Sequence, residues 1–277
     1  KDEEESLDSN DLIYSNLILG LRDYVNKNKF PGVVLGISGG IDSAFSACVA
    51  TDALGSERVK GILMPSKFTS NESNEDANKL GKNLDIELES ISIEGIVKAY
   101  DNTLDPLFKE SKKDITEENI QSRTRGSLLM AYSNKFGHMV LTNGNKSEVS
   151  VGYSTLYGDM CGGYSVLKDL YKTTVFAVSN WRNKAFPSDA LGNKGRVIPE
   201  RIIIKKPSAE LKPNQYDEDT LPPYEILDDI LKNLIEGEQA IQDIVQRGHD
   251  PEVVRRVWRM LDRAEYKRRQ APPGVKI

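Results

Sequence analysis

The chain has 277 residues, of which 38% are hydrophobic and 29% charged, and its formal net charge is -5. This composition is ordinary for a globular protein and excludes a fibrous or wholly disordered chain. The acidic balance gives no general attraction to nucleic acid, and no apolar run approaches the roughly 20 residues that cross a bilayer. We therefore expect a cytoplasmic protein that binds neither nucleic acid nor a membrane.

The chain ends and the cysteines add few constraints. The first ten residues, KDEEESLDSN, are acidic and do not resemble a secretory signal. Because the sequence does not begin with Met, we expect part of the natural protein to lie upstream of Lys1. Cys48 falls in an expected helix and Cys161 in a Gly-rich stretch, which argues against a disulfide scaffold and a cysteine zinc site.

Strand and helix patterns alternate through the first half of the chain. The segment GVVLGI is apolar throughout, which is typical of a parallel strand covered on both faces. Its alternation with helical patterns predicts an α/β fold, a doubly wound parallel sheet with helices on both faces. The expected elements are helices over 11–29, 44–54, 72–83 and 116–134, the last with a Thr-x-x-Asn entry, and strands over 32–37, 59–65, 86–93 and 138–143.

The second half is expected to consist of loops and helices. Residues 144–167 are rich in Gly, Ser and Tyr, which indicates a functional loop. Six prolines between residues 186 and 224 predict a long, partly mobile segment that could form a lid. Helices are expected over 167–183, 224–239 and 250–270, the last with Asp250 as its cap and Pro251 in its first turn.

The strand over 32–37 leads into the hexapeptide SGGIDS, Ser38 to Ser43, at the start of a helix. Backbone N–H groups and the positive end of the helix dipole converge there and favour phosphate. The loop lacks the lysine of a P-loop and carries Asp42, a carboxylate suited to Mg²⁺ beside phosphate. Such a site leaves the α-phosphorus open to attack, which favours adenylyl transfer with pyrophosphate release. The alternative interpretation is a tight turn with a capping serine.

SGGIDS resembles the pyrophosphate-binding loop of the ATP-pyrophosphatase superfamily, which includes NAD synthetases, GMP synthetase, asparagine synthetase and tRNA-lysidine synthetases. Further segments resemble, in the same order, the synthetase domain of the glutamine-dependent NAD synthetase family. They are ENIQSRTRGSLLMAYSN (118–134), TNGNKSE (142–148), YGDMCGGYSVLKDLYKT (157–173), KKPSAEL (205–211), LPPYEILD (221–228) and DRAEYKRRQAPPGVKI (262–277). The resemblance implies one synthetase domain over 1–277, with an adenine nucleotide alpha hydrolase-like sheet and a helical C-terminal part.

In the family that these segments resemble, the carboxylate of deamido-NAD attacks the α-phosphorus of ATP and releases pyrophosphate. Ammonia then displaces AMP from the adenylate and forms the amide of NAD. Such chemistry depends on positioning and charge stabilisation and requires no covalent enzyme nucleophile. The resemblance therefore implies a ligase that forms a C–N bond, with ATP as co-substrate and Mg²⁺ as cofactor.

The same resemblance implies the roles of individual residues. Asp42 and Lys172 would be catalytic, and Asp42 and Glu148 would hold Mg²⁺. Deamido-NAD would be bound by Asn119, Arg123, Glu148 and Lys267. The ATP site would consist of Gly36, Ile37, Ser38, Gly39, Gly40, Ile41, Asp42, Ser43, Asn143, Lys172 and Ser208.

Several of these positions also have a plainer interpretation. Glu148 could be a solvated loop acid, and Lys172 and Ser208 could be solvated polar residues. We interpret Arg125 as surface charge and leave it out of the site. Most of the arginines between residues 255 and 269 are expected to form a solvated helix face.

The source of ammonia follows from the branch of the family. Ammonia-dependent relatives have threonine near Asn143, and a lysine and an aspartate near Leu156 and Gly163, so these departures favour the glutamine-dependent branch. Glutamine-dependent members carry an N-terminal amidase domain with a Glu-Lys-Cys set, which this chain has no room to include. We expect either that the amidase domain is missing from this sequence or that free ammonia is used, and we favour the first.

Two alternative functions remain open. One is another ATP-pyrophosphatase, such as GMP synthetase or a tRNA-modifying enzyme, against which the net charge and the segments KPSAEL and EYKRRQAPPG argue. The other is a non-catalytic adenylate-binding protein, against which the presence of both Asp42 and Glu148 argues. The resemblance by itself also implies a homodimer.

Overall fold

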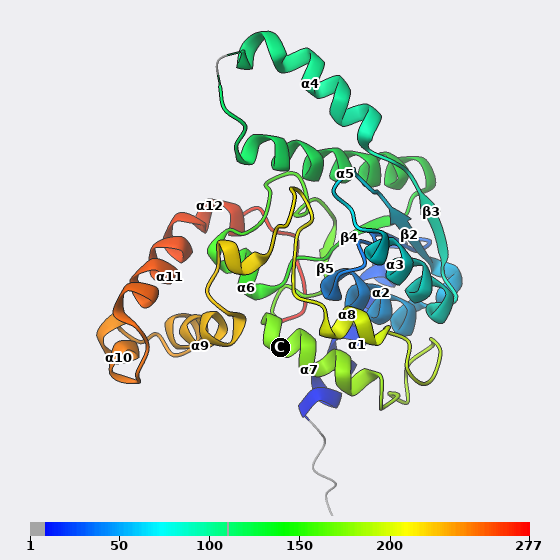
Figure 1. The fold of residues 1–277 in the computed structure, drawn as a ribbon. Coiled ribbons are helices and arrows are strands. Elements are labelled where there is room, and N and C mark those ends of the chain that lie inside the picture. The colour runs from blue at the N-terminus through cyan, green and yellow to red at the C-terminus, as the bar shows by residue number, and fades with distance from the viewer. Residues whose placement is uncertain (1–8, 110) are drawn as a thin grey trace, which may run out of the picture.

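The computed structural model describes residues 9–109 and 111–277, so the acidic segment over residues 1–8 lies outside the described part. A five-stranded sheet with the order β3-β2-β1-β4-β5 forms the centre, and all its strand pairs are parallel. Helices cover both faces of this sheet (Figure 1). The predicted doubly wound α/β fold is therefore confirmed. The strand order reverses between β1 and β4, which makes their carboxyl ends the expected place for a ligand.

The elements have the following bounds. The strands are β1 (Val33–Gly36), β2 (Val59–Leu63), β3 (Glu87–Ser90), β4 (Met139–Thr142) and β5 (Tyr164–Ser165). The α-helices are α1 (Ser9–Lys27), α2 (Ile41–Leu54), α3 (Asn71–Leu84), α4 (Glu94–Phe108), α5 (Ile115–Phe136), α6 (Lys146–Val151), α7 (Lys172–Arg182), α8 (Glu200–Ile204), α9 (Tyr224–Ile235), α10 (Ile241–Gln246), α11 (Pro251–Arg263) and α12 (Glu265–Arg268). Short 3-10 turns lie at η1 (Ser56–Arg58) and η2 (Asp217–Asp219).

Alternate side chains of β1 enter two different cores. Val33 and Leu35 pack with the helices α1, α2, α3 and α7, whereas Val34 faces a smaller cluster with Leu129 of α5. Both clusters are apolar, which explains why the strand reads as a continuous hydrophobic run. In Figure 1, α5 lies across one face of the sheet, and α4 projects beyond it.

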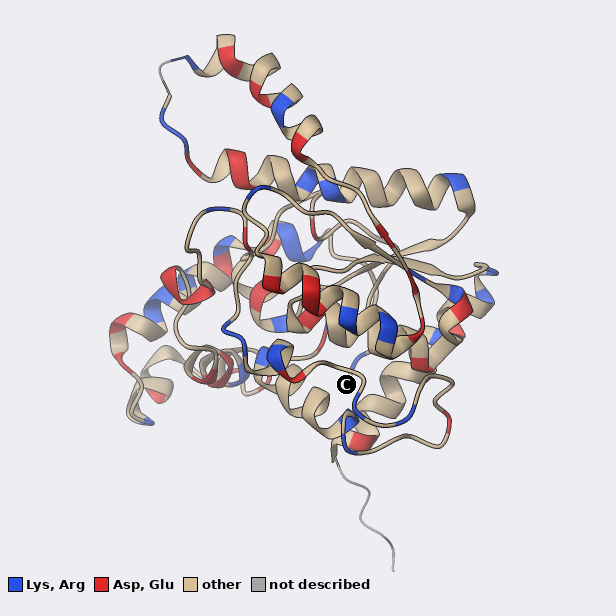
Figure 2. Ribbon diagram, turned by 45° about the vertical axis from the view of Figure 1, so that its right-hand side comes forward, with Lys and Arg blue, Asp and Glu red and all other residues tan. Residues whose placement is uncertain are grey.

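The C-terminal helices form a separate apolar cluster beside the sheet. Leu227 and Ile230 of α9 pack with Val254 and Val257 of α11, and all four side chains are fully buried. The four arginines of α11 are exposed, and Glu252 and Asp262 lie near the two ends of the helix (Figure 2). This arrangement confirms the predicted helical C-terminal part and the solvated arginine face of α11.

The expected helix over 167–183 was wrong at its start, because α7 begins only at Lys172. The first two amides of α7 find acceptors on other helices. Lys172 N donates to Ser147 Oγ at 2.8 Å, and Thr173 N donates to Asp228 Oδ2 at 2.9 Å. These contacts provide hydrogen-bond acceptors for the first amides of the helix, so the helix can begin at Lys172. The turn before it buries Leu170 in the main core.

Other local predictions were also wrong. The predicted loop over 144–167 contains α6 and β5, the predicted helix over 224–239 ends at Ile235, and the helix predicted over 250–270 breaks at Ala264. Helix α5 is capped by Asp114 with Glu117 in a capping box, and the Thr-x-x-Asn entry does not cap it. Helices α4 and α10 were not predicted. Short elements of this kind depend on tertiary packing more than on local pattern.

A fully buried ion pair joins two helices beneath the sheet. Arg182 Nε lies 2.6 Å from Asp52 Oδ2, and neither side chain is exposed. Tyr14 of α1 donates its hydroxyl to the same oxygen at 2.6 Å. Because each charge has left water, each depends on the other for compensation.

We predict that Asp52→Ala lowers the free energy of unfolding by about 3–5 kcal/mol, because it leaves the buried Arg182 cation without its partner. Urea denaturation monitored by circular dichroism measures this change. The matched control is Glu200→Ala, which breaks an exposed pair with Arg196 and should cost less than about 1 kcal/mol. Equal costs for the two variants would contradict the prediction.

Candidate functional site

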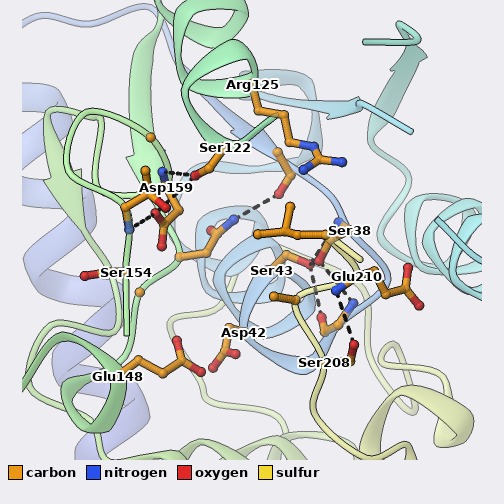
Figure 3. A pocket seen from close by; sticks show the side chains of 18 of the residues that line it. Ser38, Asp42, Ser43, Ser122, Arg125, Glu148, Ser154, Asp159, Ser208 and Glu210 are labelled. Atoms are coloured by element: carbon orange, nitrogen blue, oxygen red, sulfur yellow. Dashed lines mark hydrogen bonds between the residues drawn. The ribbon is translucent and has the colours of Figure 1, made fainter. Parts of the chain in front are cut away.

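A cavity of about 510 Å³ opens at the carboxyl edge of the sheet. It is bordered by the β1–α2 loop, by α5, by the loop after α6, and by the segment over 205–217 (Figure 3). Every site residue predicted from the sequence lines this cavity except Gly39. The fold thus gathers in one place residues that are spread over more than 200 positions of the chain, from Gly36 to Lys267.

Gly39 serves the shape of the β1–α2 loop instead. Its φ of +77° is a left-handed conformation that side chains disfavour, and a Cβ there would lie 2.3 Å from the Ser73 carbonyl oxygen. The N-cap of α2 is Gly40, so no side chain caps the helix. This finding removes the capping-serine interpretation, and the first amides of α2 remain free to face an anion.

Two hydroxyls brace the loop from within. Ser43 Oγ accepts the amide of Ser38 at 3.2 Å and donates to the Gly40 carbonyl at 3.0 Å. Ser38 Oγ accepts the amide of Gly40 at 3.3 Å. The hexapeptide therefore has a fixed shape before any ligand enters it.

The ammonium of Lys172 lies between the two carboxylates that were predicted from the sequence to share one site, Asp42 and Glu148. Its Nζ is 2.5 Å from Asp42 Oδ2 and 2.9 Å from Glu148 Oε1. Asp42 stands at the start of α2 after β1, and Glu148 stands on α6 after β4. The two adjacent strand ends thus bring the carboxylates to one point, as Figure 3 shows.

Sequence reasoning missed the third carboxylate of this cluster, Asp217. It accepts hydrogen bonds from Tyr224 at 2.7 Å and from Tyr153 at 3.2 Å, and the Tyr224 hydroxyl also contacts Glu148 at 3.1 Å. Asp217 is 4% exposed and lies in the cavity wall. The only signal in the sequence was the acidic run DEDT, which by itself does not distinguish a solvated turn from a site.

Burial and charge act on this cluster together. Burial raises the pKa of Glu148, and the Asp42 and Asp217 carboxylates raise it further against the opposing effect of Lys172. Burial also raises the pKa of Asp217. Burial lowers the pKa of Lys172, but Asp42 and Glu148 raise it more, so the group stays cationic. Three carboxylates around one ammonium leave an excess of negative charge in the cavity wall.

A second group of predicted residues surrounds the loop after α6. Lys267 Nζ donates to the carbonyls of Gly152 and Ser154 at 2.8 and 2.6 Å, and Arg123 Nε donates to Leu156 O at 3.2 Å. Asn119 Oδ1 accepts the Thr155 hydroxyl at 2.8 Å. These three side chains therefore lie on one side of the cavity, where they hold the loop and retain polar atoms for a ligand.

Asn143 and Ser208 lie on two other walls. Asn143 Nδ2 donates to Gly36 O at 2.9 Å, while its buried Oδ1 has no partner among the described residues. Ser208 Oγ donates to the Gln215 carbonyl at 2.5 Å, which shapes the segment over 205–217. Neither side chain is a solvated polar residue.

Glu210 fastens the segment over 205–217 to the start of α3. Its carboxylate accepts Ser73 Oγ at 2.8 Å and Ser70 Oγ at 3.0 Å, and it pairs with Lys205 Nζ at 2.9 Å. Burial raises the pKa of Glu210, but the hydrogen bonds and charge of Lys205 and Ser73 lower it more, so the pKa is below its ordinary value. The ionised form therefore stabilises the attachment of this segment to the start of α3.

We predict that Glu210→Gln lowers the Tm at pH 7, and that the difference from the parent protein shrinks as the pH falls. A depressed pKa gives stability above the unfolded value of about 4.3, and this stability is lost as the pH falls through the folded pKa. Thermal unfolding between pH 7 and pH 3 measures the effect. A difference that is constant over this range would contradict the prediction.

Comparison with known proteins assigns this architecture to a family. The family model described as NAD synthase matches residues 13–271. The chain belongs to the NAD synthase family. Membership decides against GMP synthetase and the tRNA-modifying enzymes, which the sequence had left as alternatives.

Individual relatives agree with this assignment. Glutamine-dependent NAD(+) synthetase of Thermotoga maritima is 51% identical over 265 residues, which are 96% of this chain and 45% of that protein. The structure of glutamine-dependent NAD+ synthetase from Acinetobacter baumannii in complex with ADP is 45% identical, with a TM-score of 0.70 over 100% of this chain and 49% of that one. The NH3-dependent NAD synthetase from Campylobacter jejuni, solved with nitrate, is 26% identical, with a TM-score of 0.75 over 97% of this chain and 100% of that one.

The chain spans about half the length of the curated relatives it matches. Their names denote an enzyme that forms a C–N bond. Among residues 9–109 and 111–277, no helix is long and apolar enough to cross a membrane. The same residues contain no group of three or more His, Cys, Asp or Glu side chains arranged to hold a metal ion, and Cys48 and Cys161 are both free.

Proposed function

We propose that this chain is a synthetase domain that converts deamido-NAD to NAD, with ATP as co-substrate and a deamido-NAD adenylate as intermediate. One observation carries the proposal. A phosphate-binding helix start without a P-loop lysine opens into the same cavity as the Asp42, Lys172 and Glu148 cluster. This combination suits attack at the α-phosphorus and departure of pyrophosphate.

The β1–α2 loop would bind the phosphates of ATP. The free amides at the start of α2 and the hydroxyl of Ser38 supply donors without a mobile cation, while Ser43 braces the loop. Asn143 and Ser208 would complete the ATP site from β4 and from the segment over 205–217. The solved relative from A. baumannii binds ADP, which supports an adenine nucleotide here.

Deamido-NAD would lie on the side of Asn119, Arg123 and Lys267. These residues combine an amide with two cations, which suits a ligand that carries phosphates and a carboxylate. Burial lowers the pKa of Lys267; the charge of Asp159 opposes this effect, and the neighbouring Arg123 adds to it. An anionic ligand would therefore add to the compensation that Asp159 already provides for these cations.

We propose that Asp42 and Glu148 hold Mg²⁺, because carboxylate oxygens are its preferred ligands and the region has an excess of negative charge. In this structure Lys172 Nζ lies between the two carboxylates, so binding of the ion requires the ammonium to move aside. When bound, Mg²⁺ would neutralise phosphate charge and leave room for water and phosphate ligands. Lys172 already holds the two carboxylates together. We assign to this lysine the further role of meeting the phosphate oxygens, since an ammonium has three donors and two are directed at carboxylates.

Other features of the proposal concern the whole protein. Relatives twice as long bear the glutamine-dependent name, so we propose that ammonia reaches this site from an amidase domain that this chain does not contain. We further propose that residues 1–277 form one domain and that its segment over 186–224 moves as a lid. The protein would be cytoplasmic and homodimeric, without a nucleic-acid partner.

The test of activity supplies the protein with deamido-NAD, ATP and Mg²⁺, and with either ammonium or glutamine. We expect NAD, AMP and pyrophosphate in equal amounts with ammonium, and little product with glutamine alone. Chromatography of the nucleotides measures all three products. Formation of ADP, or the absence of NAD with ammonium, would refute the proposal, and nucleotide binding without turnover would favour a non-catalytic adenylate-binding protein.

We predict that Asp42→Ala reduces pyrophosphate release by at least about 100-fold, because it removes a group that holds charge at the reacting phosphate. The fold should survive, since the Asp42 side chain is 18% exposed. The control Asp23→Ala removes an exposed carboxylate of α1 that pairs only with Lys27, and it should leave turnover unchanged. Unaltered pyrophosphate release in the Asp42 variant would remove Asp42 from the mechanism.

A further inference from the structure

Arg125 was interpreted from the sequence as surface charge, and the structure corrects this. The side chain extends from α5 into the cavity, and Figure 3 shows its guanidinium directed toward the β1–α2 loop. Its Nε donates to the Met64 carbonyl at 3.0 Å, just beyond the end of β2. This bond fixes the plane of the guanidinium and leaves its two terminal amino groups toward the cavity.

No carboxylate among the described residues forms an ion pair with Arg125. Glu210 is the carboxylate whose charge acts on it, but Glu210 bonds to Lys205, Ser70 and Ser73. Burial lowers the pKa of Arg125 to about 10, so the group still carries its charge at neutral pH. A half-buried cation that lines a cavity and has no carboxylate partner in the described part of the chain is well placed to meet an anionic or hydrogen-bond-accepting ligand.

The position of Arg125 indicates which part of a nucleotide it meets. The helix start at Gly40 supplies donors for phosphate, and the carboxylates of Asp42 and Glu148 occupy the β4 side of that loop. The remaining part of a nucleotide must then extend toward β2. That side of the cavity is lined by the apolar residues Ile37, Leu63, Met64, Pro65 and Leu129. Apolar walls with a few placed polar groups are typical of a pocket for a nucleobase.

We propose that Arg125 binds the adenosine half of ATP, with its terminal amino groups donating to acceptor atoms of the base and ribose. The identification of the ligand as ATP rests on the proposed function, whereas the position of the guanidinium in the cavity does not depend on it. A planar guanidinium can donate in a fixed fork and can also lie against an aromatic ring, which lysine cannot do. Arg125 would thus bind the ligand beside the end of β2, whereas Asn119 and Arg123 lie beside the loop after α6.

The experiment compares three probes by isothermal titration with the parent protein and with Arg125→Met. The probes are ADP, adenosine and inorganic pyrophosphate, all with Mg²⁺. We expect the affinity for ADP and for adenosine to fall by the same factor, about 10- to 100-fold, as for the loss of a charged hydrogen bond. The affinity for pyrophosphate should stay within about twofold, because the phosphate loop is untouched.

Two controls separate binding from structure. Arg259→Met removes an exposed arginine of α11 and should change none of the three affinities. The Tm of Arg125→Met should be nearly unchanged, because the variant replaces a half-buried charge that has no carboxylate partner among the described residues with an apolar side chain of similar length. Arg125→Lys keeps the charge without the planar fork, and we expect it to lose most of the affinity for adenosine.

Three results would overturn the inference. They are an unchanged affinity for adenosine, a loss that extends equally to pyrophosphate, and a lowered Tm together with weaker binding of every probe. The first excludes contact, the second indicates a phosphate contact, and the third indicates a structural role. The test is independent of turnover, so failure of the parent protein to make NAD would refute the proposed function and leave this inference standing.

Discussion

The arrangement of the site depends on one buried cation, Lys172, which holds Asp42 and Glu148 within hydrogen-bond distance of a single atom. Through these contacts it joins α2, α6 and α7, whose residues come from three separate parts of the chain. Removing two carboxylates from water is unfavourable unless a positive charge compensates them. The sheet pairs β1 with β4, and the lysine then holds together the two carboxylates that follow these strands.

The remaining walls combine backbone amides with basic side chains that bond to backbone carbonyls. The start of α2 offers amides without a side-chain cap, and the loop after α6 is held by Lys267 and Arg123 through its carbonyl groups. Such groups need little rearrangement when a charged ligand enters, because the loop shapes are already fixed. The polar atoms of the cavity wall are thus held in place before a ligand binds. Two sides of the cavity carry uncompensated charge, which is negative near Asp217 and positive at Arg125.

The segment over 205–217 connects the negatively charged side of the cavity with the positively charged side. It contributes Asp217 to the acidic cluster, and through Glu210 it attaches to the start of α3 near Arg125. Its proline content suggested a mobile segment, yet three of its polar side chains, Ser208, Glu210 and Asp217, have definite partners. A small number of hydrogen bonds therefore hold the segment in its place at the cavity.

The sequence by itself determined the sheet, its parallel direction and the phosphate loop, because apolar strands, amphipathic helices and SGGIDS are local patterns whose geometry follows from the backbone. It also indicated Asp42 as a carboxylate beside the phosphate loop, whereas Lys172 and Glu148 were named through a family resemblance. Tertiary structure alone decided that these three side chains meet, that Asp217 joins them, and that Arg125 lines the cavity. It also decided where α7 begins, since Ser147 and Asp228 supply acceptors for its first amides. The physical reason is the same in each case: the environment of a charge or an amide depends on groups far away in the chain, which no local pattern records.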